Sequence, residues 1–471
     1  MKKSSVMAFM STMERWAVRL SGKFDEKYYL HRYPDVARAD FDPLKHFCTH
    51  GWREGRDPGP LFDNRYYSSS KMKDCKNIIN PVIHWVFHGC RKSKGNIPPE
   101  VYRFRKMIQQ KRLCSMKQGD IIFIVHDCSL TGAPVFILNL LKWILDKTSI
   151  EFSVVILSSG PLLQEFCHIS ECIFYWALSD ESERKQFQNL LSGAKTLYVN
   201  SIASGSVLPE IAASARQVIT HVHEMEGAFE AYPDELSNVL AFSTTYVVVS
   251  ELGKEALERR LDDARQHPRQ IAIIRPAVPI KPLLEHENTG SSFLIVGCGK
   301  VSARKGVDIF CQVARALVED GVTEFKMRWI GGSGDVDILS LIKEMGLADF
   351  VEWFDEAGSP RSHFDQADIF ILTSREDPFP LVCLEAAECA TPIVCFGPPA
   401  GDVFRFVEQG CGIVVPYLDV PAMKDAVKYL LENKKQAQEM GKIGRDRVIA
   451  QHSFDTIGPE IISHICPLHA S

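Results

Sequence analysis

The sequence lacks any Cys-x-x-Cys pair, although it contains 14 cysteines. The cysteines are scattered along the chain, as at Cys48, Cys128, Cys298 and Cys389. Closely paired cysteines are typical of zinc sites and redox motifs, and small secreted domains use regular disulfide frameworks. Their absence argues against a zinc site and against a disulfide framework. It predicts reduced thiols in a cytoplasmic protein.

Long apolar runs are also missing. The most apolar helical stretch, residues 135–145, is interrupted by Asn139 and Lys142, and it falls short of the roughly 20 apolar residues that span a bilayer. A basic pair opens the sequence, but the apolar run that follows, residues 6–10, is short and no small-residue cleavage site comes after it. The sequence therefore predicts neither a signal peptide nor a membrane span.

The charge is unevenly distributed. The 471 residues are 45% hydrophobic and 24% charged, which is ordinary for a globular protein of two or three domains. The net charge is −5, yet residues 1–115 hold 23 Lys and Arg against 11 Asp and Glu, a balance of +12, which leaves −17 for the rest. The front of the chain is therefore predicted to meet an anionic surface, such as the inner face of a membrane.

Residues 4–20 carry an apolar stripe at helical spacing. Its members are Val6, Phe9, Met10, Met13, Trp16, Ala17 and Leu20. Such a stripe belongs either to an amphipathic helix that lies on a membrane or to a helix packed against its own protein. The sequence leaves both interpretations open.

Residues 24–99 contain an internal repeat with an offset of 38 residues. The matching pairs are Phe24-Asp25 with Phe62-Asp63, Tyr28-Tyr29 with Tyr66-Tyr67, Pro43 with Pro81, His46 with His84, and His50-Gly51 with His88-Gly89. Coincidences at one fixed offset predict duplicated units, each a short helical hairpin. The four histidines stand at i and i+4, as metal ligands can, but no acidic or cysteine partner recurs with them. We therefore expect core or capping roles for them.

Beyond a basic stretch at residues 101–118, apolar runs alternate with helix-length segments. The strand candidates of the first group are 121–125, 152–157, 196–199, 217–222 and 246–249. This alternation predicts a doubly wound parallel sheet. In its first turn, Gly132 would let the backbone approach a ligand and Thr131 would cap the following helix. After the fourth run, His221 and His223 are expected at the carboxyl edge of the sheet, where catalytic groups collect.

A polar, proline-rich hinge at residues 276–287 precedes a second group of strands. The candidates are 293–297, 327–330, 350–353, 369–372, 393–396 and 412–415. The first turn of this group, residues 297–306, contains glycines followed by Arg304-Lys305-Gly306 at the start of a helix. Such a turn places cations and backbone N–H groups where a phosphate binds.

The stretch from Ser374 to Ala386 joins the buried run at residues 369–372 to a helix that Leu381 opens. Free N–H groups at that helix start suit a phosphate or a polar sugar. Seven residues separate Asp377 from Glu385. One carboxylate therefore extends over the loop and the other comes from the helix face, and carboxylates are suited to accepting hydrogen bonds from a sugar diol.

An acidic residue, seven residues and then Glu resembles the donor-site signature of family 4 glycosyltransferases, which are retaining enzymes with the GT-B fold. The resemblance covers about residues 119–455, and Lys305-Gly306 matches a second motif of the family. It implies catalytic roles for His223, Asp377 and Glu385, with His221 as the competitor of His223. It also implies that the nucleotide sugar binds a further set of residues. These are Gly132, Arg304, Lys305, Glu376, Phe379, Pro380, Leu381, Val382 and Glu385.

Two positions depart from that pattern. The family usually has Glu at the first acidic position, where this chain has Asp377 with Glu376 beside it, so either can be the acid that contacts the sugar. A second basic residue of the family is missing, and Arg304 or Lys300 takes its place. The resemblance implies no metal ion and no cofactor, because the leaving phosphate of the donor helps deprotonate the acceptor hydroxyl in this family.

The first part of the chain resembles small modules attached to bacterial polysaccharide glycosyltransferases, with a Tyr-Pro-Asp-Val segment at residues 33–36. The fold class expected is α/β, a GT-B pair of Rossmann-like domains facing a cleft, after a mainly helical repeat region. The expected boundaries are 1–23 for an amphipathic helix, 24–100 for the repeats, 101–118 for a linker, 119–280 for the acceptor domain, 281–455 for the donor domain and 456–471 for a return segment.

The sequence therefore predicts a hexosyltransferase that uses a nucleotide sugar and a glycan or lipid-linked acceptor, without nucleic acid. A cytoplasmic location is expected, with peripheral contact to the inner face of the membrane. A nucleotide-sugar epimerase or a sugar phosphorylase on the same fold remains an alternative. So does a non-catalytic scaffold for glycan assembly, in which the basic repeats are the working part.

Overall fold

The structure is a computed structural model of the chain. The residues it describes are 13–33, 36, 39, 41–59, 62–64, 67–68, 72, 79–89, 121–158, 160–169, 173–175, 184–185, 188, 194–264, 270–283, 292–355 and 360–466. The chain divides into two compact units, residues 1–129 with 152–194 and residues 130–151 with 195–471. None of the helices in the described ranges is long and apolar enough to cross a membrane.

The first unit begins with a small helical region. A helix at residues 13–20 is followed by α2 (Glu26–Arg32), by α4 (Pro43–His46) with the π-helical turn η1 (Phe47–Gly51), and by α6 (Pro81–His84) with η2 (Trp85–Gly89). These elements enclose a core of their own. Its aromatic members are Tyr29, Phe47, Trp52, Phe62, Tyr67 and Trp85.

Two short segments at the 38-residue offset, residues 43–51 and 81–89, each form an α-helical turn followed by a π-helical turn. Asp42 and Asn80 cap the helices α4 and α6, and a proline follows each cap. The hydroxyl of Tyr29 lies 3.0 Å from Nδ1 of His46, and the hydroxyl of Tyr67 lies 3.2 Å from Nδ1 of His84. These two histidines therefore take part in tyrosine contacts beside the core. Within the described ranges, no group of three or more His, Cys, Asp or Glu side chains is arranged to hold a metal ion.

The first sheet is parallel and has the strand order β3-β2-β1-β4-β5-β6-β7. Its strands are β1 (Ile121–Val125), β2 (Phe152–Ile156), β3 (Ile173–Tyr175), β4 (Ala194–Asn200), β5 (Ala215–Val222), β6 (Thr245–Val248) and β7 (Gln270–Ile273). All five strands expected from the sequence are present. The short strands β3 and β7, which form the two edges, were not predicted.

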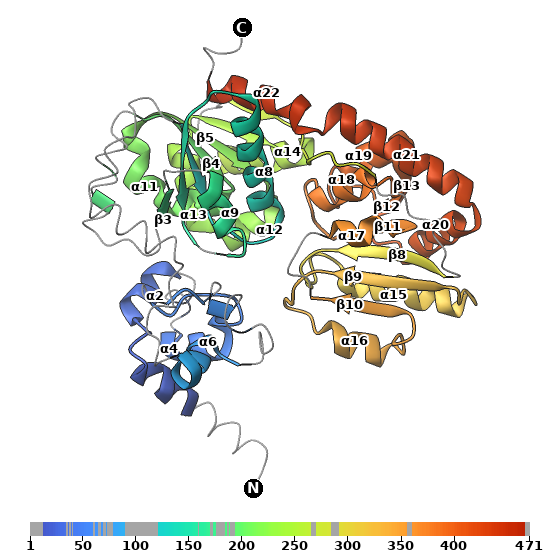
Figure 1. The fold of residues 1–471 in the computed structure, drawn as a ribbon, viewed down its shortest axis with the longest axis horizontal. Coiled ribbons are helices and arrows are strands. Elements are labelled where there is room, and N and C mark those ends of the chain that lie inside the picture. The colour runs from blue at the N-terminus through green and yellow to red at the C-terminus, as the bar shows by residue number, and fades with distance from the viewer. Residues whose placement is uncertain are drawn as a thin grey trace. The chain divides into compact units, whose positions relative to one another are not determined.

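Helices connect these strands (Figure 1). They are α8 (Gly132–Lys147), α9 (Leu163–Ile169), the 3-10 turns η5 (Ile202–Val207) and η6 (Ala212–Ser214), α11 (Leu208–Ile211), α12 (Glu226–Ala231), α13 (Pro233–Phe242) and α14 (Glu251–Asp263). The helix α8 buries one face, and Thr131 precedes it without the side-chain cap expected from the sequence.

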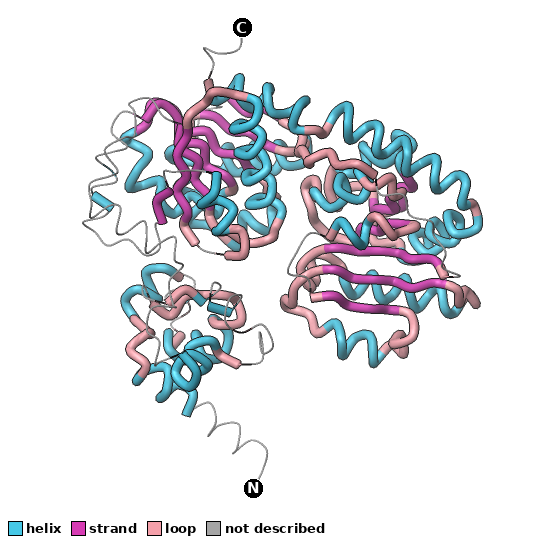
Figure 2. The backbone as a smooth tube through the Cα atoms, in the orientation of Figure 1, coloured by secondary structure: helices cyan, strands magenta, loops and turns pink. Residues whose placement is uncertain are grey.

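The second sheet is also parallel, with the order β10-β9-β8-β11-β12-β13. Its strands β8, β9 and β10 are seen side by side in Figure 2. The strands are β8 (Phe293–Cys298), β9 (Phe325–Ile330), β10 (Val351–Phe354), β11 (Ile369–Leu372), β12 (Ile393–Phe396) and β13 (Gly412–Val415). All six were predicted from apolar runs. The central strands β11 and β12 are buried along their whole length, and strands buried on both faces read as continuous apolar runs.

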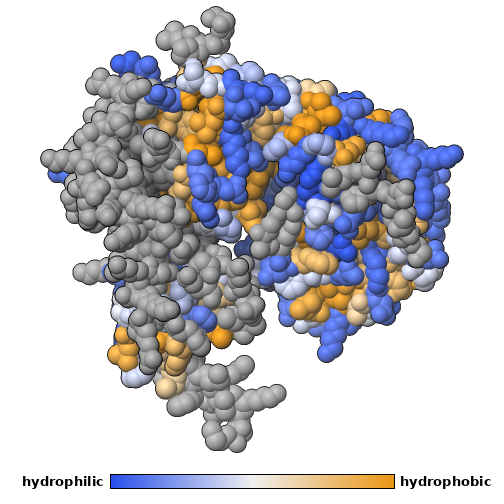
Figure 3. Space-filling view, viewed as in Figure 1, coloured by the Kyte–Doolittle hydropathy of each residue, from blue (hydrophilic) through white to orange (hydrophobic). Residues whose placement is uncertain are grey.

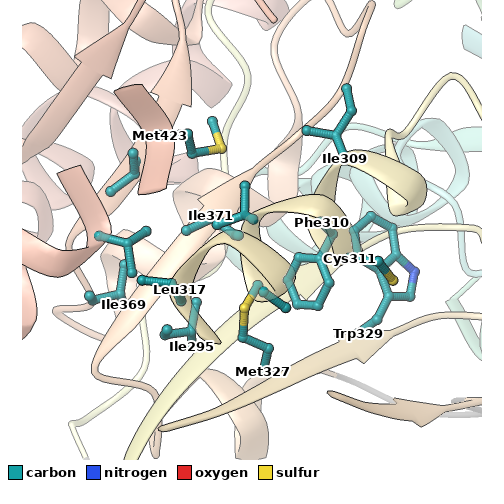
Figure 4. Packing of buried hydrophobic residues seen from close by; sticks show 14 of the residues in the cluster. Ile295, Ile309, Phe310, Cys311, Leu317, Met327, Trp329, Ile369, Ile371 and Met423 are labelled. Atoms are coloured by element: carbon teal, nitrogen blue, oxygen red, sulfur yellow. The ribbon is translucent and has the colours of Figure 1, made fainter. Parts of the chain in front are cut away.

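Helices cover both faces of the second sheet. They are α15 (Val307–Glu319), α16 (Ile338–Glu344), α17 (Arg361–Phe364), α18 (Leu381–Glu388), α19 (Val403–Phe406) with the turn η7 (Val407–Cys411), α20 (Val420–Glu432) and α21 (Lys434–Gln451). Ile369 and Ile371 of β11 belong to the same buried cluster as Phe310, Trp329 and Met423 (Figure 4). The alternate residues, Phe370 and Leu372, pack on the opposite face with Leu384 and Phe406. This alternation is what the period of two along a strand requires.

The last helix, α22 (Phe454–Ile465), lies beside α8 of the first sheet within the second unit (Figure 1). Trp143 Nε1 donates a hydrogen bond of 2.8 Å to Asp455, and the rings of Phe136 and Phe454 are 5.6 Å apart. Because α22 contacts α8, the chain returns from the second sheet to the first through α21 and α22. The surface over α20 and α21 is mostly hydrophilic (Figure 3).

Candidate functional site

Two strand-end loops of the second sheet lie against each other. The loop after β8 ends at Gly306, whose φ of +71° is one that L side chains rarely adopt, and a Cβ there would overlap the carbonyl oxygen of Thr373. The Thr373 hydroxyl donates to the carbonyl of Lys305 at 3.2 Å, and the N–H of Arg375 donates to the carbonyl of Arg304 at 2.8 Å. The cations that follow β8 are therefore held next to the acids that follow β11.

Lys305 and Asp377 form an ion pair between these loops, and the Lys305 ammonium donates to Oδ2 of Asp377. Their side chains are only 15% and 10% exposed. Arg304 lies further from the acid, at 3.9 Å, is half exposed, and donates to the carbonyl of Glu376 at 2.7 Å. Ion pairs with little solvent around them interact strongly, so Lys305 and Asp377 fix each other's position.

The backbone of Asp377 is held from the side of β12. Its N–H donates to the carbonyl of Ala400 at 2.7 Å, and the N–H of Asp402 donates to the carbonyl of Pro378 at 2.9 Å. A Cβ at Gly401 would overlap the carbonyl oxygen of Asp377. Hydrogen bonds from the loop after β8 and from the loop after β12 thus fix the backbone of the loop that carries the predicted acids, as is typical of a binding loop on a rigid scaffold.

The helix α18 starts at Leu381 after Pro380, which provides no side-chain cap. The first N–H groups of a helix have no partner within the helix, so this end can accept an anion or a polar group. Phe379 packs near the ring of His452 at 5.5 Å, and Leu381 and Val382 are half-buried. Burial lowers the pKa of His452 to about 4, so this histidine is neutral near neutral pH.

Glu385 lies one turn into α18 and is half-buried. Removal of water around its carboxylate raises the pKa of Glu385 from 4.5 to about 7, and nearby Lys281 opposes that shift. Among the described residues, no group donates a hydrogen bond to this carboxylate. A desolvated carboxylate that still has its acceptor capacity is what binding of a sugar diol requires.

The raised pKa of Glu385 has a consequence for stability. As pH rises from 4.5 to about 7, the unfolded chain ionises at this residue while the folded chain stays protonated, so folding becomes less favourable; above about 7 the cost is constant. Glu385→Gln removes this cost. We expect the free energy of unfolding of the variant to rise relative to that of the wild type between about pH 5 and about pH 8. Urea denaturation of both proteins at the two pH values measures the difference, and a constant difference would contradict the expectation.

Glu376 does not face the Lys305 side chain. Its carboxylate accepts the backbone N–H of Gly227 in α12, at 3.1 Å to Oε1 and 3.3 Å to Oε2. The two neighbouring acids therefore have different partners. Glu376 binds the first turn of a helix that follows β5, and Asp377 binds the cation that follows β8.

His223 lies at the carboxyl end of β5, as predicted. Its Nε2 is 2.9 Å from Oδ1 of Asn200, the last residue of β4, and its ring lies 4.1 Å from that of His221. His221 is completely buried, with Nδ1 2.6 Å from the Tyr198 hydroxyl, and burial together with the neighbouring His223 holds its pKa well below the usual value. His221 is therefore a neutral interior residue and His223 is the more accessible of the two.

Gly132 lies beside the first residue of α18. A Cβ at Gly132 would stand 3.8 Å from Cδ1 of Leu381, so the start of α8 and the start of α18 are neighbours. The amide of Asn200 donates to the carbonyl of Ala133 at 3.0 Å and so ties this helix start to His223. Asn200 was not predicted, although its place at the carboxyl end of a buried strand is the signal that identified the histidines.

Lys305, Arg304, Glu376 and Asp377 therefore come together directly, and Gly132 joins them through Leu381. Asp335 and Asp337, which form the sequence Asp-x-Asp typical of some metal loops, are used by the backbone. Asp335 accepts the N–H of Ala303 at 3.2 Å and Asp337 accepts that of Ser340 at 3.1 Å, so their role is local capping.

The region of the second sheet matches a known protein family. Residues 285–447 match the family described as Glycosyl transferases group 1. Among curated proteins, the D-inositol 3-phosphate glycosyltransferase of Paenarthrobacter aurescens is 29% identical over 32% of this chain and 38% of its own length. The alpha-D-kanosaminyltransferase of Streptomyces kanamyceticus is 28% identical over 36% of this chain and 44% of its own length. The chain thus spans less than half the length of these curated relatives.

Solved structures extend the likeness to both sheets. The sucrose-phosphate synthase of Thermosynechococcus elongatus matches with a TM-score of 0.60 and 18% identity, over 75% of this chain and 99% of that protein. The Anabaena protein Alr3699/HepE in complex with UDP-glucose matches with a TM-score of 0.64 and 14% identity, over 74% of this chain and 100% of that protein. At this identity the likeness shows the fold, which is the predicted pair of Rossmann-like domains. The chain therefore has the GT-B fold, and residues 285–447 within it match the Glycosyl transferases group 1 family.

Proposed function

We propose that the protein is a retaining glycosyltransferase that moves a hexose from a nucleotide sugar to a growing glycan, such as an O-antigen, a capsule or a lipid-linked oligosaccharide. The observation that carries the proposal is the arrangement around α18. Lys305 is held at Asp377, and Glu385 presents a desolvated carboxylate without a hydrogen-bond donor among the described residues. A cation for a diphosphate and an acceptor for a diol are the two groups that a nucleotide sugar needs.

In the proposed site, Lys305 and Arg304 neutralise the donor diphosphate, assisted by the open N-terminus of α18. Glu385 holds the ribose diol, and Asp377 contacts the transferred sugar. Gly132 leaves room for the donor beside Leu381, and Phe379, Pro380 and Val382 shape the wall of the site. His223 stands beside the sugar. The leaving phosphate takes the proton of the acceptor hydroxyl, and no metal ion is required.

A thermal-shift screen with UDP, GDP, dTDP, CMP and ADP sugars tests the proposal. A ligand at 100 times its Kd adds about 2.7 kcal/mol of apparent stability, which is readily measured. The expected result is stabilisation by one class of nucleotide sugar and by its free diphosphate. Absence of binding by any nucleotide would favour the non-catalytic scaffold instead.

The products distinguish the remaining enzymes. NMR of the product formed from an α-linked donor should show an α-linked glycoside if the configuration is retained. Incubation with the nucleotide sugar alone should leave the sugar unchanged. A free epimer would instead identify an epimerase, and release of a sugar phosphate from a glycan and inorganic phosphate would identify a phosphorylase.

For the rest of the chain we propose residues 24–100 as tandem repeats. Of the amphipathic helix expected at residues 1–23, residues 1–12 lie outside the described residues, and so does the whole linker expected at residues 101–118. Residues 119–280 form the acceptor domain, residues 281–455 the donor domain and residues 456–471 the return segment.

The helix at residues 13–20 favours peripheral contact of the first unit with a membrane. Val18 is buried, and Glu14 accepts a hydrogen bond of 2.9 Å from Asn80, so one face of the helix packs on the repeat region. Met13, Trp16 and Leu20 are 50%, 61% and 64% exposed, so an apolar face points outward next to basic residues. Val6, Phe9 and Met10, which belong to the same predicted stripe, lie outside the described residues.

Trp16→Gln combined with Leu20→Gln is expected to reduce sedimentation with anionic liposomes by about tenfold. The two changes remove apolar surface that would be buried in the membrane, and a loss of roughly 1.4 kcal/mol in binding free energy weakens affinity tenfold. Binding of the wild type should also fall with salt, since each basic residue near an anionic membrane contributes about 1 kcal/mol. Leu339→Gln is the control, because Leu339 is 59% exposed in α16 of the other unit. If the wild type shows no salt-sensitive binding, the membrane role fails and the alternative, that the repeats only brace the protein, is preferred.

A further inference from the structure

We propose that Glu376 and Asp402 are paired positioning residues. They hold the loop between β11 and α18, named the donor loop, against the first turns of α12 and α14. The same geometry assigns the donor-contacting role to Asp377 and not to Glu376. That this loop binds a nucleotide-sugar donor rests on the proposed function. The contacts themselves are present without any ligand, and they can be tested without one.

The first contact is that of Glu376 with Gly227. The single N–H of Gly227 faces both carboxylate oxygens, at 3.1 Å and 3.3 Å. A Cβ at Gly227 would stand 3.0 Å from Oε1 of Glu376, so glycine leaves the space that lets the acid reach the backbone. The neighbouring Glu226 is held by Arg259 at 3.1 Å and by Arg260 at 2.6 Å, which ties α12 to α14.

The second contact is that of Asp402 with Leu252. The N–H of Leu252, in the first turn of α14, donates to Oδ2 of Asp402 at 2.8 Å. Arg405 approaches the other oxygen at 3.2 Å, and the Asp402 side chain is only 4% exposed. A carboxylate at the first turn of a 13-residue helix is favoured by the helix dipole, and burial strengthens the interaction.

The two contacts are joined on the side of the second sheet. Glu376 precedes Asp377, whose N–H donates to Ala400, and Asp402 donates its own N–H to Pro378. On the other side, α12 and α14 are joined by the ion pairs of Glu226. The contacts therefore close a ring of four elements, in which a displacement of either helix pulls on the loop that carries Asp377.

This ring separates the roles of the two acids. The carboxylate of Glu376 is engaged by a backbone group that follows β5, and releasing it would free the loop. Asp377 is paired with Lys305, a cation that a diphosphate also attracts. When the donor diphosphate binds Lys305, the carboxylate of Asp377 becomes available to the sugar. Positioning by Glu376 and Asp402 thus presents Asp377 at a fixed place.

The contacts differ in strength. The contact of Glu376 is exposed to solvent, whereas that of Asp402 is part-buried. Charge-assisted hydrogen bonds are roughly twice as strong as neutral ones, and solvent weakens them. Replacement of each acid by its amide keeps the shape and removes the charge, so the larger effect is expected for Asp402→Asn.

Hydrogen–deuterium exchange of the ligand-free protein tests the ring directly, because each contact protects one amide. Glu376→Gln should accelerate exchange of the peptide that contains Gly227, and Asp402→Asn should accelerate exchange at Leu252. If the contacts are coupled, Asp402→Asn also accelerates exchange at Gly227 by about threefold or more. Unchanged exchange at Gly227 in Asp402→Asn would overturn the coupling. Glu319→Gln, which removes an exposed acid paired with Arg315 on α15, is the control.

Donor affinity and turnover then separate the two acids. Glu376→Gln should raise the KM for the donor by about tenfold with kcat changed less than about threefold, because a displaced loop still contains Asp377. Asp377→Asn should lower kcat itself. If Glu376→Gln lowers kcat while exchange at Gly227 stays that of the wild type, Glu376 is the donor acid and the assignment is overturned. If no variant, nor the wild type, binds a nucleotide sugar, the proposed function fails, while the exchange result still decides the ring.

Discussion

Glu385→Gln is expected to reduce turnover by at least about tenfold and to leave the fold intact. The amide accepts hydrogen bonds on one atom only, so it cannot capture both hydroxyls of a ribose diol. A lost hydrogen bond to a charged group costs about 1.5–3 kcal/mol, which corresponds to roughly 10 to 150-fold. Initial rates with the nucleotide sugar identified by the thermal-shift screen measure the effect. Donor affinity equal to that of the wild type would remove Glu385 from the site.

The pH dependence gives this prediction a second readout. Because the pKa of Glu385 is raised to about 7, the carboxyl is largely protonated at about pH 6 and largely ionised at about pH 8. If the ionised form binds the diol, donor affinity of the wild type rises by up to about tenfold over this interval. The affinity of Glu385→Gln should be flat over the same interval, as measured by calorimetry. An equal rise in both proteins would assign the pH dependence to another group.

The strands were predictable where their burial was complete. The runs at β1, β11 and β12 are wholly apolar and wholly buried, so local composition alone reveals them, whereas β9 and β10 mix apolar residues with Lys326, Arg328 and Glu352. The edge strand β7 is only half-buried: its first residue, Gln270, is exposed, and only three apolar residues, 271–273, follow within the strand. The three-residue strand β3 is too short for any periodicity to be read. Both depend on pairing with a neighbouring strand.

The site was predictable where it is local in sequence. Asp377 lies in the loop before α18 and Glu385 lies in α18 itself, so the number of residues between them follows from one loop and the helix turn next to it. The partners of Glu376 and Asp402 are backbone N–H groups 149 and 150 residues away, and a backbone donor has no residue type that marks it. Gly227 is visible as a glycine, but nothing in its surroundings indicates which acid its missing side chain admits.

Lys305→Met is the second change with a large expected effect. Methionine keeps the apolar part of the lysine stem, which packs on Gly299, and removes the ammonium. Asp377 is 8% exposed, and among the described residues Arg304, at 3.9 Å, is the cation that remains within ion-pair distance of it. Loss of one partner of a buried ion pair costs about 3–5 kcal/mol, and partial exposure lowers that figure, so we expect a loss of about 2 kcal/mol in the free energy of unfolding.

Donor affinity should also fall by at least about tenfold in Lys305→Met, because a charged contact to the diphosphate is lost. Lys424→Met is a matched control. The Lys424 side chain is also 15% exposed and is paired with Asp320 at 2.6 Å, but it lies on α20. Urea denaturation and calorimetry with the free nucleoside diphosphate should show a small change in stability and unchanged affinity for this control.

The double variant Lys305→Met with Asp377→Asn separates the two effects of the lysine. It leaves no unpaired charge, and replacing both members of a buried ion pair is often neutral for stability. We therefore expect the double variant to recover most of the unfolding free energy that Lys305→Met loses. Its affinity for the nucleoside diphosphate should stay as low as that of Lys305→Met, because the phosphate still lacks its cation. Recovery of that affinity would mean that Lys305 serves only to neutralise Asp377, and the diphosphate would then have to be bound by Arg304 and the N-terminus of α18.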